Sequence, residues 1–189
     1  DGSKPLSMNY VSYTATPYAN FLNEASEVSL YPRDFVAVLN PAKEYFGAKQ
    51  IFGLENDEYY RGLPMVREIT VDDRDLVKDV HAGLEAYLLK SFEDALHWFL
   101  LATSIMRYRK YKKPISMLVH TSQKQQHHKI FAELINGYFR STSKAKILED
   151  CRTLYEKEQK KFTKEDFEME FEIYPNKGNV KDYPPFEKI

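Results

Sequence analysis

Apolar residues recur at intervals of three and four along the second half of the chain, which is the pattern of amphipathic helices. The first helix is predicted to begin at Ser91, where Asp94 stands at the spacing of a capping box. A basic run follows Met106, and cations there suit the C-terminus of a helix. The apolar stripe of this helix comprises Phe92, Ala95, Leu96, Phe99, Ala102, Thr103 and Met106. Further apolar residues lie on both sides of the stripe, so the helix is predicted to be buried on most sides.

Two further helices are predicted downstream. Ser122 and Gln125 have the spacing of a second capping box, and one apolar face follows them. Another helix is predicted from about Ser143 to Lys161, and Thr163 with Asp166 predicts a cap for a brief helical turn. The apolar faces of these two helices comprise Ile130, Phe131, Leu134, Ile135, Tyr138 and Phe139, and then Ile147, Leu148, Cys151, Leu154 and Tyr155.

Several short runs favour β-strands instead. Ile115–His120 follows Pro114 as a compact β-prone run suited to the interior of a sheet. Residues 34–39 predict a buried strand, residues 9–13 and 66–71 predict shorter ones, and residues 167–173 alternate with a period of two. Because helices and strands alternate, we expect an α/β fold with a mostly parallel sheet covered by helices. Pro41 to about Arg74 shows no sustained period and predicts an irregular connector.

Composition supports a folded core and excludes several classes of protein. Apolar residues make up 43% of the 189, and the 14 Tyr and 12 Phe provide large side chains for packing. The single cysteine, Cys151, excludes an internal disulfide and is expected to pack on a helix stripe. No apolar run approaches the length of a membrane span, so we expect no membrane contact and a cytoplasmic location.

Charge is segregated although the net charge is only −1. Between Ala95 and Ala132 there are 7 Lys or Arg residues and no Asp or Glu, while residues 54–79 and 149–172 are acid-rich. Within this region residues 107–113 contain five cations and two interleaved tyrosines, a composition that favours binding to phosphates and stacking on bases. The cations are Arg107, Arg109, Lys110, Lys112 and Lys113, and of these Arg107, Arg109, Lys112 and Lys113 are the predicted DNA contacts. A solvated helix end would have the same composition, so both interpretations stay open.

Two pairs of hydroxyl side chains stand at the ends of predicted strands. Thr14 and Thr16 precede Pro17, at a place where an open α/β sheet could sense a nucleotide. Thr121 and Ser122 open a predicted helix, where free backbone N–H groups attract a phosphate. In both places a plain helix cap accounts for the same residues.

Metal chemistry has little basis in the sequence. His127 and His128 are adjacent, so on a helix they point about 100° apart and cannot chelate one ion. Asp72, Asp73 and Asp75 with Lys78, or the Glu156-Lys157-Glu158 run, supply the residue types of a metal-dependent nuclease, as charged surfaces also do. The sequence has no Gly-x-x-x-x-Gly-Lys-Ser/Thr loop and no acidic metal-binding strand. We therefore predict no metal site, and no ATP bound by this chain alone.

Five segments in a fixed order carry a family resemblance: Tyr13–Asn20, Leu30–Phe35, Tyr45–Ala48, Ser91–Ala102 and Ser116–Ser122. Together they resemble the "Z-one" domain, described as an endonuclease, of bacterial superfamily-two helicase-like proteins linked to DNA restriction and defence. The similarity spans roughly Tyr10 to Phe139, and the tail beyond is less diagnostic.

The resemblance implies an arrangement of lobes and a set of roles. Residues 1–40 would close a first RecA-like lobe, residues 41–90 would form a family-specific connector, and residues 91–189 would begin a second RecA-like lobe. Thr14 and Thr16 would couple nucleotide state to DNA engagement, while Thr121 and Ser122 would touch the DNA backbone. ATP and Mg²⁺ are implied for the parent protein, with DNA and the remainder of that protein as partners.

Three functions follow as hypotheses. The first is a fragment of a helicase-like, DNA-acting NTPase that is inactive alone. The second is a metal-dependent nuclease whose site is assembled from the acids of Asp72–Asp79 and Glu149–Glu172. The third is an interaction module of a defence complex, in which the many aromatic residues form a partner surface.

Overall fold

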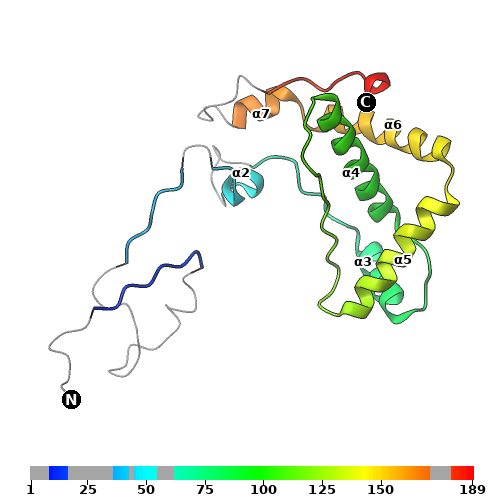
Figure 1. Ribbon diagram of the computed structural model, residues 1–189, viewed down its shortest axis with the longest axis horizontal. Coiled ribbons are helices and arrows are strands. Elements are labelled where there is room, and N and C mark those ends of the chain that lie inside the picture. The colour runs from blue at the N-terminus through cyan, green and yellow to red at the C-terminus, as the bar shows by residue number, and fades with distance from the viewer. Residues whose placement is uncertain (1–8, 17–35, 43–44, 55–61, 171–179) are drawn as a thin grey trace, which may run out of the picture. The chain divides into compact units, whose positions relative to one another are not determined.

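The computed structural model describes residues 9–16, 36–42, 45–54, 62–170 and 180–189 (Figure 1). The chain divides into two units, residues 1–42 and residues 43–189. Every helix of the described ranges belongs to the second unit. The predicted site residues therefore lie in the second unit, except for Thr14 and Thr16, which lie in the first.

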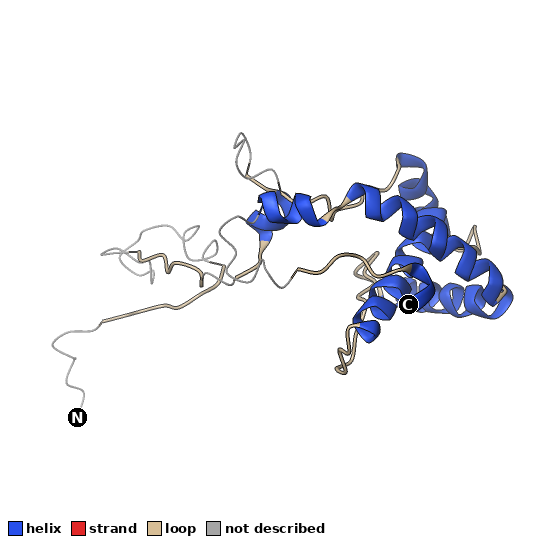
Figure 2. Cartoon of the chain, turned by 90° about the horizontal axis from the view of Figure 1, so that it is seen from above, coloured by secondary structure: helices blue, strands red, loops and turns tan. Residues whose placement is uncertain are grey.

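The second unit is helical in its described parts (Figure 2). Within these parts, no helix is both long and apolar enough to cross a membrane. The α-helices are α2 (Ala48–Phe52), α3 (Val71–Ala82), α4 (Lys90–Tyr108), α5 (Gln125–Ser141), α6 (Lys144–Lys161) and α7 (Lys164–Glu170), and a 3₁₀ turn, η2, covers Phe186–Lys188.

The described residues contain no β-strand, so the prediction of an α/β fold with a RecA-like parallel sheet is wrong. The segment from Ile115 to His120 shows why. It is extended but pairs with no strand in the described structure, and Ile115, Met117 and Val119 are half-buried while the residues between them are exposed. Met117 packs against a helical core. The alternation of apolar residues therefore arises because one face of this extended segment lies against helices. A high β-propensity indicates residues that suit a half-buried extended surface, and such a surface need not belong to a sheet.

The other predicted strands also take different conformations. Residues 9–13 and 36–39 form exposed loops, and residues 66–70 are irregular. Val71 opens α3, and Phe167 lies in α7. Residues 34–35 and 171–173 lie outside the described part of the chain. Short β-prone runs thus find no partner strand here, and helix packing determines their conformation.

Helix α3 lies inside residues 41–90, which the resemblance assigned to a family-specific connector. Its N-cap, Thr70, accepts a hydrogen bond from the Asp73 N–H at 3.1 Å, and its C-cap, Gly83, has a left-handed φ of 74°. Val80 on this helix is fully buried, and Leu76 and Val77 pack beside it. The connector therefore supplies part of the core.

Two hydrophobic clusters hold the helices together, and α4 contributes to both. The first core joins α3, α4 and α5 and contains the buried residues Val80, Leu88, Leu89, Leu96 and Phe131. The second core joins α4 and α6 and contains Leu101, Ile105, Cys151 and Tyr155. Figure 1 shows α4 at the centre of this group, with α6 and α5 on one side.

Two predicted capping boxes are wrong because tertiary packing moves the helix starts. Helix α4 begins at Lys90 after Leu89, which is buried in the first core, so Ser91 falls within the first turn. Asp94 instead forms an ion pair with Lys90 at 2.9 Å. The N-cap of α5 is Lys124, two residues beyond Ser122, and it has no side-chain cap.

Predictions that depended on local chemistry are confirmed. The helix predicted from about Ser143 to Lys161 is α6, and its N-cap, Ser143, accepts a hydrogen bond from the Lys146 N–H at 3.2 Å. Asp166 accepts from the Thr163 N–H at 2.8 Å, and Thr163 Oγ1 accepts from the Asp166 N–H at 3.1 Å, which completes a capping box. Cys151 is buried, and burial raises the pKa of its thiol to about 11, so it packs as an apolar side chain.

A buried ion pair fastens the segment before α3 to α6. Glu158 is 4% exposed, and the Arg67 guanidinium donates to both of its carboxylate oxygens. Arg67 also donates to the carbonyl of Pro64. Because these bonds join residues 91 apart in sequence, they order a segment that has no regular structure.

Candidate nucleic-acid interface

The basic segment, residues 107–113, begins in the last turn of α4 and turns sharply at Lys110. Lys110 has a φ of 66°, the left-handed conformation that usually selects glycine after a helix. Its N–H donates to the Arg107 carbonyl at 3.0 Å, and the Tyr111 N–H donates to the Met106 carbonyl at 2.9 Å. These bonds form a Schellman motif, which gives the segment a defined path away from the helix.

The two arginines of the basic segment hold backbone in place. Arg107 Nη1 donates to the carbonyls of Tyr111 at 2.6 Å and Lys113 at 3.0 Å. Arg109 Nη2 donates to the carbonyls of Lys181 at 3.1 Å and Asp182 at 3.0 Å. Carbonyl acceptors leave the guanidinium charge in place, so both side chains position the loop and still contribute positive potential.

The lysines of the basic segment face solvent. Lys110, Lys112 and Lys113 are all exposed, and none forms an ion pair with a carboxylate of the described residues. Tyr108 and Tyr111 are also exposed beside them. The segment thus presents unneutralised ammonium groups and phenol rings on a fixed loop.

Thr121 and Ser122 lie at the far end of the same loop, where it reaches α3 and α5. Thr121 Oγ1 lies 3.1 Å from His81 Nε2, and Ser122 Oγ lies 2.8 Å from His127 Nδ1. Ser122 Oγ also accepts from the Lys124 N–H at 3.2 Å. The two hydroxyls that were predicted to touch DNA therefore lie within hydrogen-bonding distance of histidine side chains of the same chain. The role of Thr121 and Ser122 in DNA contact stays a prediction.

Four of the 5 histidines gather around this turn. The His81 and His127 rings stack at 4.0 Å with an interplanar angle of 14°, and His128 Nε2 lies 2.5 Å from the Ser122 carbonyl oxygen. Burial, followed by the charges of His127 and His128, lowers the pKa of His81. Sequence spacing did not predict the place of His81 in this gathering, because it depends on α3 packing beside α5.

No group of three or more His, Cys, Asp or Glu in the described part of the chain could hold a metal ion. Asp75 is paired with Lys78 at 2.6 Å on α3, and Asp150 with Lys146 at 2.8 Å on α6. Some of the acidic residues proposed for a nuclease site therefore form ion pairs with lysines on their own helix. Residues 171–172 of that set lie outside the described ranges.

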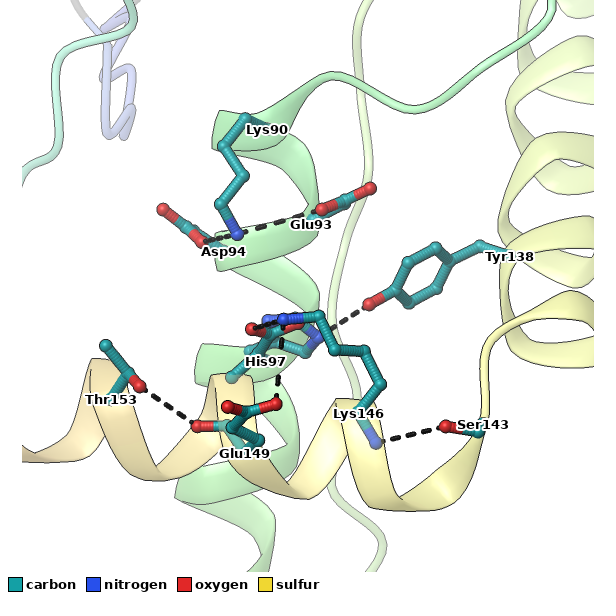
Figure 3. Close-up of polar contacts among 10 residues, drawn as sticks. Lys90, Glu93, Asp94, His97, Tyr138, Ser143, Lys146, Glu149 and Thr153 are labelled. Atoms are coloured by element: carbon teal, nitrogen blue, oxygen red, sulfur yellow. Dashed lines mark hydrogen bonds and ion pairs between the residues drawn. The ribbon is translucent and has the colours of Figure 1, made fainter.

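His97, the remaining histidine, lies between α4, α5 and α6 (Figure 3). Its ring is fully buried, its Nε2 lies 2.8 Å from the Tyr138 hydroxyl, and its Nδ1 has no hydrogen-bond partner. Burial, assisted by the charge of Lys90, lowers its pKa, while Asp150, Asp94 and Glu93 act in the opposite sense. The structure thus places His97 inside the helical core.

Acidification is expected to destabilise the fold through His97 and His81. Because both pKa values are lowered from 6.5 on folding, the unfolded chain binds more protons, and the free energy of unfolding falls as pH drops below 6.5. Urea titrations at mildly alkaline and mildly acidic pH measure this loss. His97→Gln, which does not titrate, should lose less stability over the same interval, and an equal loss would remove His97 as a cause.

Thr14 and Thr16 lie in the first unit. The Thr16 N–H donates to Thr14 Oγ1 at 3.1 Å within an exposed turn. The predicted strand tip is wrong, since residues 9–16 form a loop, and Pro17 lies outside the described residues. Nucleotide coupling by these threonines stays a prediction.

Residues 91–184 match the family model of the Z1 domain. The start of the match coincides with Ser91, where the sequence predicted a new segment, and it extends beyond Phe139 into the tail that was considered less diagnostic. Residues before 91 lie outside the match. Comparisons with curated proteins and with solved structures found no match.

Proposed function

From the Z1 domain match at residues 91–184, we propose that this chain is a DNA-contacting module of a larger bacterial helicase-like protein of restriction or defence. The described part of the module is helical and forms no RecA-like sheet. The residues present do not fit ATP or Mg²⁺, because the sequence has no phosphate-binding glycine loop and the described part has no metal-holding group. Those ligands belong to the remainder of the parent protein, and the chain alone is expected to be inactive.

The exposed lysines of the basic segment carry this proposal. Lys110, Lys112 and Lys113 extend from a loop whose path is set by the Schellman turn and by the carbonyl bonds of Arg107 and Arg109. A fixed row of cations meets a phosphate backbone without first ordering the loop, and neutralising phosphates releases condensed counterions. Affinity for DNA should therefore fall steeply with salt.

Replacing Lys110, Lys112 and Lys113 together with glutamine is expected to weaken DNA binding and flatten its salt dependence. Each lost phosphate contact removes about 0.9 from the slope of log K against log salt for duplex DNA, so the three substitutions should remove roughly 2–3. Fluorescence anisotropy of labelled DNA over a salt series measures both quantities. The lysines are preferred to the arginines as targets because Arg107 and Arg109 also hold backbone.

The matched control replaces Lys144, Lys157 and Lys160 with glutamine. These lysines are also exposed, lie on α6, and change the net charge by the same amount. The control should retain most of the affinity and the slope. If both triple variants behave alike, the effect is one of net charge and the basic segment is not the contact.

A further inference from the structure

A pocket of about 280 Å³ adjoins the basic segment. Its floor is the face of α4 that carries Trp98, Ala102 and Met106, and the aromatic rings of Phe162, Phe167 and Tyr183 belong to its walls. These walls come from the end of α6, from α7 and from the C-terminal segment. A pocket this small and this aromatic suits one planar ring better than a larger ligand.

The rim of the pocket is cationic. Arg109, Lys164 and Lys181 line it, and none of its described lining residues is Asp or Glu. The charge of Lys164 is partly neutralised by Glu168, whose Oε1 lies 3.8 Å from the lysine Nζ. Arg109 and Lys181 have no carboxylate partner among the described residues. An aromatic interior beneath a positive rim is complementary to a ring that carries a negative group at its edge.

Arg109 connects the pocket to the basic segment. It is the C-cap of α4, one residue before Lys110, and its bonds to the carbonyls of Lys181 and Asp182 hold the C-terminal wall of the pocket in place. Arg109 thus belongs both to the lining of the pocket and to the basic segment, so the two features adjoin at this residue.

We infer that this pocket binds an unpaired nucleobase of single-stranded DNA, whose backbone phosphates contact the basic segment. The inference rests on the proposed function and names the form of DNA that the site takes. Stacking on Trp98 and its aromatic neighbours tolerates any base, because every base presents a π-face. A paired base inside a duplex cannot enter the pocket, so the module prefers single strands.

Trp98 is the one tryptophan of the sequence, so its fluorescence reports directly on the pocket. The full chain is titrated with a short mixed-sequence single strand and with the duplex of the same sequence, and binding is measured separately by anisotropy. The single strand is expected to quench Trp98 as it binds. The duplex is expected to bind through the lysines without quenching.

Ala102→Leu is expected to fill the pocket floor, lower single-strand affinity by about tenfold and abolish the quenching. It should leave duplex affinity unchanged. The control is Ala132→Leu, the same enlargement at an exposed position of α5 outside the pocket. If Ala102→Leu fails to fold, the comparison of strand and duplex on the unmodified chain still tests the inference.

The outcomes separate the inference from the proposed function. Binding of both DNA forms without quenching would overturn the pocket assignment and leave the lysine contact intact. Absence of binding to either form would overturn both. Quenching by thymidine monophosphate as strong as that by the strand would show a pocket for free nucleotides, which also overturns the assignment to a DNA strand.

Discussion

Replacing Phe131 with alanine is expected to lower the free energy of unfolding by about 3–5 kcal/mol. Phe131 is 2% exposed at the centre of the first core. Its ring lies 5.3 Å from the Phe92 ring on α4 and meets the His81 ring on α3 edge to face at 5.6 Å. The side chain therefore joins three helices, and its removal leaves a cavity that none of them can close alone. Urea-induced unfolding followed by circular dichroism measures the loss.

Phe139→Ala provides a control on the same helix. Phe139 has the same side chain two turns later, but it is 41% exposed, so its truncation should cost less than about 1 kcal/mol. Both phenylalanines were placed on one apolar face by the sequence pattern, and only the structure distinguishes them. Similar losses for the two variants would show that α5 is rotated relative to the fold described, and that α3 does not cover Phe131.

Replacing Arg67 with methionine is expected to cost about 3 kcal/mol, the lower end for breaking a buried ion pair, because Arg67 is partly exposed. The substitution leaves the Glu158 carboxylate buried without its cation and keeps most of the apolar stem of the side chain. The segment before α3 also loses its attachment to α6. Thermal and urea unfolding of the variant measure the loss.

Two further variants separate the charge from the packing. Arg74→Met removes an exposed arginine of α3 and should change stability by no more than about 0.5 kcal/mol. Arg67→Met combined with Glu158→Met removes both charges and should recover much of the loss, because no buried charge then lacks a partner. A loss for Arg67→Met no greater than that for Arg74→Met would contradict the buried pair.

The long helices were predictable because their signals are local and repeat over several turns. The 3.6-residue period predicted α4, α5 and α6, and the short-range cap of Thr163 with Asp166 was recognised from spacing alone. Short β-prone runs did not predict strands reliably, because the same residues also suit a half-buried extended segment that pairs with no strand. Residues 115–120 are such a segment and line a helical core without joining a sheet.

The sequence predicted which residues make up the basic segment, but it did not predict that the arginines and the lysines have different roles. Adjacent cations identified the basic segment, yet Arg107 and Arg109 were given the same role as the lysines. Their bonds reach carbonyls as distant as Asp182, and sequence spacing carries no information about such partners. The contact of Thr121 with His81 has the same cause, since His81 reaches it only through the packing of α3 on α5, whereas Ser122 meets His127 only five residues along the chain.

Periodicity, caps and charge segregation along the chain therefore sufficed for three helices, a packed cysteine and the position of a basic segment. These features depend on neighbours within a few residues, so the order of the amino acids specifies them. The class of the fold, the burial of His97 and the pocket beside Arg109 depend on contacts between distant helices. Packing free energy is summed over the whole core, and for that reason it overrode the β-propensity of short runs and decided which side chains remained available to a ligand.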